Sequence, residues 1–268
     1  MKLRLIIFLA IFLATSAAYF LMPEAEVIST GVLYLVFPVG AALIGLYASR
    51  IYGFNSANGR ALILITGGLV CWGVAEIITY VLDNFLTDFN TFPSIDNAFL
   101  LLASPIFGAG IYQGYVTAGI KLKLVKKSLL AMVLSASLIL TVLVVYFGIY
   151  LVYDPEADIL SNIVLVGLGL SDLVLIILSL FTILVASEYK GGKLASFWKT
   201  MALGFFLFLI ADVWFAIYGN IYTEDIYGIL IELTWIAGYM VLAFGMLENY
   251  LHISAVQKKI KLKLSQIN

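Results

Sequence analysis

Four acidic residues lie inside long apolar stretches of this 268-residue chain: Glu76, Asp172, Asp212 and Glu232. An ionised side chain at the centre of a lipid bilayer costs at least about 2.5 to 3.5 kcal/mol. No Lys, Arg or His accompanies these acids within the stretches. Each carboxyl must therefore be protonated, share a proton, bind a cation or face water, so the four residues indicate titratable sites or a cavity.

The acids recur at the same spacing in two halves of the chain. A shift of 136 residues aligns Glu76 with Asp212 and Asp96 with Glu232, so the two acids of each half are 20 residues apart. This match predicts a duplicated unit of four helices. Because four membrane crossings return a chain to its starting side, the halves would share one orientation, as in parallel-repeat transporters. Chance similarity between apolar helices is the alternative.

Aromatic residues accompany the acids. Trp235 and Tyr239 fall on the same helical face as Glu232 by three- and four-residue spacing. We predict that eight residues bind a ligand or an ion: Glu76, Asp96, Asp172, Asp212, Glu232, Trp72, Trp235 and Tyr239. An interfacial aromatic belt is the interpretation for four further residues near the predicted helix ends: Tyr80, Trp214, Tyr218 and Tyr222.

Each acid also has a structural interpretation. A protonated Asp or Glu can hydrogen-bond across helices and stabilise a membrane bundle by about 0.6 to 2 kcal/mol per bond. Asp96 follows Pro93 and Ser94 at the start of a predicted helix, where the helix dipole favours an acid. Structural and functional roles both remain open for these carboxyls.

The elements that carry these residues are membrane helices. Apolar residues make up 63% of the chain and charged residues 12%, and the mean hydropathy is +1.08, which excludes a soluble globular protein. We predict an all-α fold, a single integral membrane domain built as a bundle of eight transmembrane helices. The repeat halves cover about 1–120 and 121–252. The predicted helices cover about 3–22, 27–50, 61–83, 95–119, 128–152, 159–187, 197–220 and 226–250.

The charges are distributed asymmetrically along the chain. All 15 Lys and Arg residues fall at the N-terminus, in alternate connections or at the C-terminus, whereas the intervening connections carry only acids. The positive-inside rule therefore predicts a multi-pass protein of the cell membrane with both termini cytoplasmic. Residues 253–268 form a short basic tail, expected to bind anionic lipid headgroups or, alternatively, to dock on a partner. The first apolar run has a second interpretation, as a signal peptide cleaved after Ala17.

Several kinds of chemistry are excluded by what the chain lacks. His252 is the single histidine and Cys71 the single cysteine, so haem ligation by paired histidines, a histidine zinc site and an intramolecular disulfide are excluded. No mid-helix lysine can carry retinal, and no Walker motif or nucleophile elbow occurs. The net charge of −1 does not indicate a nucleic-acid partner. We predict no cofactor, no metal site and no catalytic residue, and any enzymatic activity would depend on carboxylates.

The segment from Trp72 to Tyr80, followed by the Pro93-Ser94-x-Asp96 turn, resembles a family of eight-helix membrane modules. Those modules are sensor-like and stand ahead of bacterial cyclic-dinucleotide enzymes and archaeal histidine kinases. Residues 210–214 and 233–239 look like the second half of the same module. This chain shows no output domain, and it has Ala75-Glu76 where the family often shows Gly-Asp. The resemblance implies a sensory input module that acts on a separate cytoplasmic signalling partner.

A weaker similarity connects the chain to the lysoplasmalogenase-like eight-helix family. Ser171-Asp172 and Ala211-Asp212 are similar to the acid pairs of that family, which implies lipid hydrolysis with one carboxyl as general base and another as acid. The sequence thus predicts a ligand-binding module with an outward-facing acidic cavity, in contact with membrane lipids. Lipid hydrolysis and transport of a cation or small solute are the alternatives.

Overall fold

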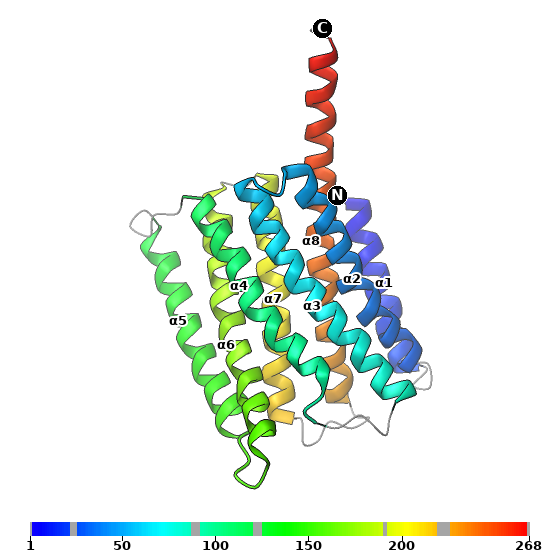
Figure 1. Ribbon diagram of the computed structural model, residues 1–268, viewed down its shortest axis with the longest axis vertical. Coiled ribbons are helices and arrows are strands. Elements are labelled where there is room, and N and C mark those ends of the chain that lie inside the picture. The colour runs from blue at the N-terminus through cyan, green and yellow to red at the C-terminus, as the bar shows by residue number, and fades with distance from the viewer. Residues whose placement is uncertain are drawn as a thin grey trace.

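The computed structural model describes residues 2–21, 26–86, 92–119, 125–189, 192–218 and 226–266. These residues form helices and no strand (Figure 1). The helices are α1 (Lys2–Leu21), α2 (Glu26–Tyr52), α3 (Ala57–Phe85), α4 (Ile95–Thr117), α5 (Lys127–Leu143), η4 (Val144–Tyr150), α6 (Ile159–Glu188), α7 (Lys193–Tyr218) and α8 (Ile226–Ser265). The segment η4 is a π-helix that continues α5 without a break.

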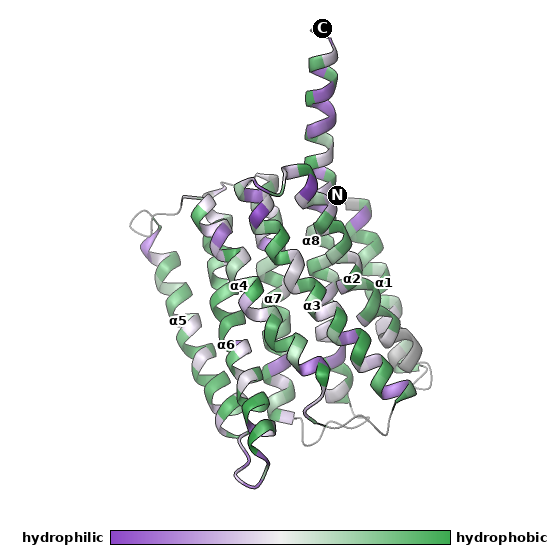
Figure 2. Cartoon of the chain, in the orientation of Figure 1, coloured by the Kyte–Doolittle hydropathy of each residue, from purple (hydrophilic) through white to green (hydrophobic). Residues whose placement is uncertain are grey.

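The predicted all-α membrane bundle is confirmed. Seven of the described helices are long and apolar enough to cross a membrane, with α5 and η4 counted as one, and α1 contributes the shorter apolar segment Leu3–Ala18. Apolar residues cover most of each helix, and hydrophilic residues gather at the helix ends (Figure 2). The chain is therefore a helical multi-pass membrane protein.

Helix α8 is longer than predicted. The sequence analysis ended this helix at residue 250 and assigned 253–268 to a separate tail, but α8 is continuous to Ser265 and projects beyond the bundle (Figure 1). Neither Gly nor Pro occurs after Gly245, so nothing in this part of the sequence interrupts the helix. The binding of this basic extension to lipid headgroups stays a prediction.

Six helices close into a ring. Each of α2, α3, α4, α6, α7 and α8 packs on the next, and α8 packs back on α2. Helix α1 lies outside the ring against α2 and α8, and α5 lies outside it against α6 and η4. If α2, α3 and α4 are matched with α6, α7 and α8 in that order, each helix has neighbours in the ring that correspond to those of its match. A duplicated four-helix unit would produce this arrangement, although the duplication itself stays a prediction.

Both termini lie at the same end of the bundle (Figure 1). Within the described ranges, the cations fall at that end or on the α8 extension, as with Arg50 at the end of α2, Arg60 at the start of α3 and Lys127 at the start of α5. An ion pair of 2.5 Å between Arg4 and Glu248 connects α1 to α8 there. Cleavage of the first apolar run stays an open alternative.

The ring is tightly packed where α3 meets α4. At Gly110, an added Cβ would lie 2.9 Å from the Ile65 backbone nitrogen and 3.0 Å from the Ala61 carbonyl oxygen. A side chain at this position would push the two backbones apart, since the neighbouring atoms belong to a helix backbone and cannot rotate away. Small residues allow such close approach between membrane helices.

We expect Gly110→Val to lower the stability of the protein by about 1 to 3 kcal/mol, the usual cost of overpacking. The measurement is the midpoint of thermal unfolding in detergent, followed by circular dichroism. Gly40→Val in α2 is the matched control, because an added Cβ at Gly40 meets nothing within 4 Å. Equal effects of the two substitutions would show that helix propensity, and not the α3–α4 contact, determines the loss.

Candidate ligand-binding cavity

A cavity of about 810 Å³ lies inside the ring, lined by residues of all six ring helices and of η4. On α3 the lining extends from Trp72 to the exposed Asp83 and Asn84, so the cavity occupies the half of the bundle farther from the chain termini. Its volume falls in the range of small-molecule binding sites, about 300 to 1,000 Å³.

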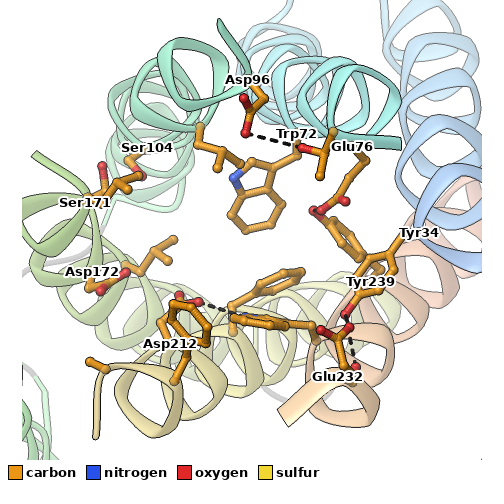
Figure 3. A pocket seen from close by; sticks show the side chains of 18 of the residues that line it. Tyr34, Trp72, Glu76, Asp96, Ser104, Ser171, Asp172, Asp212, Glu232 and Tyr239 are labelled. Carbon is orange, nitrogen blue, oxygen red and sulfur yellow. Dashed lines mark hydrogen bonds between the residues drawn. The ribbon is translucent and has the colours of Figure 1, made fainter. Parts of the chain in front are cut away.

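All eight residues predicted to bind a ligand or an ion line this cavity (Figure 3). The five carboxyls come from five different helices: Glu76 from α3, Asp96 from α4, Asp172 from α6, Asp212 from α7 and Glu232 from α8. The ring brings together carboxyls up to 156 positions apart in sequence, from Glu76 to Glu232. That these residues bind a ligand stays a prediction.

Glu76 and Glu232 each accept a hydrogen bond from a tyrosine. The Tyr239 hydroxyl donates to Glu76 Oε1 at 2.6 Å. The Tyr34 hydroxyl donates to Glu232 Oε2 and lies 3.2 Å from the Glu232 carbonyl oxygen. Glu76 also interacts electrostatically with Glu232 and Asp96. We refer to Glu76, Asp96 and Glu232 as the Glu76 cluster.

Asp96 is held by three neighbouring donors at the start of α4. The Ser94 hydroxyl donates to Asp96 Oδ1, while Thr79 Oγ1 and Asn97 Nδ2 donate to Oδ2 at 3.3 and 3.1 Å. Asp96 is 8% exposed and lies in the first turn of α4, where the helix dipole favours a negative charge. The structural role considered for Asp96 is therefore supported, and its carboxyl also lines the cavity.

Asp172 and Asp212 form a pair on the opposite wall, which we call the Asp pair. Their carboxyls interact electrostatically, and Trp235 Nε1 donates to Asp212 Oδ1 at 2.7 Å. The π-helix η4 passes beside the pair, since an added Cβ at Gly148 would lie 3.9 Å from Asp172 Oδ2. Such π-helical segments occur frequently at functional sites.

Three buried aromatic rings form the base of the cavity, which we call the aromatic floor. Trp72 lies 4.3 Å from Phe208 between ring centroids, Phe208 lies 4.6 Å from Tyr239, and Trp72 lies 5.7 Å from Tyr239. Below the floor, Phe107 and Phe205 continue the packing. The apolar core thus fills the half of the ring nearer the termini, and the other half is hollow.

Acidic side chains line the cavity. No Lys, Arg or His is present among the described residues that line it. Nowhere in the described ranges do three His, Cys, Asp or Glu side chains converge on a point where they could hold a metal ion. The carboxyls are therefore distributed over the walls and do not form a preformed chelate.

Sequence reasoning missed several lining residues. Phe208 corresponds to Trp72 under the 136-residue shift, so the repeat could have identified it. Tyr34 and Ser104 carry no comparable signal. The interpretation of Tyr80 as part of an interfacial belt needs correction, because Tyr80 lines the cavity. Of the other residues assigned to the belt, Tyr218 stacks on Tyr227 at 5.1 Å, and Tyr222 lies outside the described residues.

Comparison of the chain with protein-family models, with curated proteins and with solved structures finds no match. The similarities to sensor-like modules and to the lysoplasmalogenase-like family therefore stay predictions. The cavity itself provides the physical basis for a functional proposal.

Proposed function

We propose that the protein is a membrane module of the sensory-input type that binds a small organic cation in this cavity. The observation that carries the proposal is the set of five carboxyls lining the cavity, with no Lys, Arg or His among the described lining residues. Negative charge away from bulk water is costly unless it is paired, so a cationic ligand would be favoured there. The aromatic floor adds ring faces that attract ammonium groups.

The position of the cavity supports a receptor role. If the cationic end of the bundle faces the cytoplasm of the cell, as the positive-inside rule favours, the cavity lies in the outer half of the membrane. Helix α8 carries Glu232, Trp235 and Tyr239 at the cavity and continues to Ser265 beyond the bundle. From Glu232 to Ser265 this helix is about 50 Å long, so it connects the ligand site to the basic extension. We propose that the extension acts on a separate cytoplasmic partner and that lipids surround the bundle.

Two other functions have one supporting observation each. The Asp pair places two interacting carboxyls on one wall, and acid–base catalysis uses such residues, so lipid hydrolysis is a candidate. The helices of the two halves of the ring have corresponding neighbours, as in transporters built from parallel repeats. This arrangement favours transport of a small cation. Release of aldehyde from a lysoplasmalogen would identify lipid hydrolysis. Uptake of labelled amine into proteoliposomes would identify transport.

The proposed function predicts selective stabilisation by organic cations. We expect alkylammonium ions and diamines to raise the thermal unfolding midpoint of the detergent-solubilised protein in a saturable way. A ligand that binds only the folded state adds about 2.7 kcal/mol at 100 times its Kd. Neutral alcohols of the same length should have no such effect, because they leave the carboxyls uncompensated.

The matched variants are Glu76→Gln, which lines the cavity, and Glu248→Gln, which changes an acid of α8 outside it. We expect the first substitution to reduce the stabilisation and the second to leave it unchanged. If cations stabilise the protein no more than neutral alcohols do, the proposed function is wrong.

A further inference from the structure

The five carboxyls of the cavity fall into two groups. The Asp pair lies on one side of the cavity, and Glu76 and Glu232 lie on the opposite side (Figure 3). Asp172 interacts with Asp212, whereas Glu76 interacts with Glu232 and Asp96. The cavity therefore has two separate groups of carboxyls.

Neither group is suited to a bare metal ion. No three acidic side chains converge closely enough within the described ranges to hold one. In addition, the carboxyl oxygens already accept hydrogen bonds from Trp235, Tyr239 and Tyr34. A carboxylate has about four lone-pair positions, so each group can still accept N–H donors from one ammonium.

An apolar surface lies beside the two groups. The aromatic floor formed by Trp72, Phe208 and Tyr239 lines the same cavity, and Tyr239 interacts with both Glu76 and Asp212. Methylene groups pack well on aromatic rings, and ammonium groups are attracted to ring faces. The lining thus alternates acid, aromatic and acid, which matches a ligand with two cationic ends and an apolar chain.

Ser104 adds a polar group to the lining. The residue is 2% exposed and lines the cavity, and its hydroxyl is not one of the buried polar atoms that lack a partner in the described part of the chain. A hydroxyl on a cavity wall is available to water or to a bound ligand. In Figure 3, Ser104 lies on the wall between Asp96 and Asp172, where it could accept an N–H from a bound amine.

We propose that the ligand is a linear diamine or polyamine, with one ammonium at the Asp pair, another at the Glu76 cluster, and its methylene chain on the aromatic floor. This inference rests on the proposed function and specifies its ligand class. The cavity of about 810 Å³ has room for such a chain together with water.

The test compares diamines with amino alcohols of the same length, by isothermal titration calorimetry on the full-length protein in detergent. The series includes α,ω-diamines from ethylenediamine to diaminooctane, then spermidine. We expect a chain-length optimum and, at that optimum, binding about tenfold or more tighter for the diamine, since its second ammonium makes a charge-assisted contact. Equal affinities of diamine and amino alcohol would overturn this inference and leave the proposed function standing.

Two variants locate the ammonium sites. Asp212→Asn and Glu76→Gln each remove charge from one group, so each should abolish the preference for the diamine while the variant still binds amino alcohols. Retained binding of amino alcohols also shows that the variant is folded. Glu248→Gln, outside the cavity, should keep the full preference. A preference that persists in both cavity variants would overturn the inference, and a wild type that binds no amine would overturn the proposed function as well.

Discussion

The double variant Glu76→Gln, Asp212→Asn is expected to lose binding of organic cations by about 100-fold or more. The two substitutions remove one carboxylate from each group around the cavity. A hydrogen bond to a charged group contributes about 1.5 to 3 kcal/mol, so two lost contacts amount to about 3 to 6 kcal/mol. Each 1.4 kcal/mol corresponds to a factor of ten in Kd. Calorimetric titration against wild type measures the loss directly.

The same double variant should keep its fold. The amide groups that replace the two carboxyls retain a carbonyl oxygen that can accept from Trp235 Nε1 and from the Tyr239 hydroxyl, so both hydrogen bonds can persist. Replacing desolvated carboxylates by neutral amides should therefore leave the unfolding midpoint without ligand unchanged or higher. Loss of binding together with retained stability is the signature of a site that trades stability for function. A lower midpoint with cation binding intact would show that these carboxyls are structural.

The sequence was sufficient for the helices and for the acids that face the hollow. Each helix is a long apolar run bounded by charged or turn residues, and hydropathy locates such runs reliably in membrane proteins. The acids could be selected because an acidic residue at membrane depth almost always faces the bundle interior or water. The four acids predicted at membrane depth line the cavity for this physical reason.

The arrangement of the helices could not be predicted in the same way. Both the lipid-facing and the bundle-facing sides of these helices are apolar, so periodicity does not show which side meets which neighbour. The hydrogen bond from Tyr34 to Glu232 joins residues 198 positions apart, and no local pattern indicates it. The position of α5 outside the ring and the π-helical segment η4 are equally invisible in composition and spacing.

Trp72→Ala is expected to have the largest effect on stability, about 3 to 5 kcal/mol, as for other buried Trp and Phe residues truncated to Ala. Trp72 is 5% exposed, and its ring contacts Phe107 at 4.7 Å and Phe208 at 4.3 Å between centroids. The closed ring of helices limits how far the structure can collapse into the space left behind. Trp214→Ala, a Trp of α7 that does not line the cavity, is the matched control with a smaller expected loss.

Trp72→Phe separates the packing role of this side chain from its role toward a ligand. A phenyl ring keeps an aromatic face on the cavity floor, so we expect most of the stability and the cation binding to return, measured by thermal unfolding and by calorimetry on the same sample. The alanine variant keeps all five carboxyls but loses one face for the ligand, so its affinity for diamines should fall more than its affinity for ammonium ion itself. If Trp72→Ala weakened both ligands equally, Trp72 would act only by holding the ring of helices in place, and the aromatic floor would have no direct part in binding.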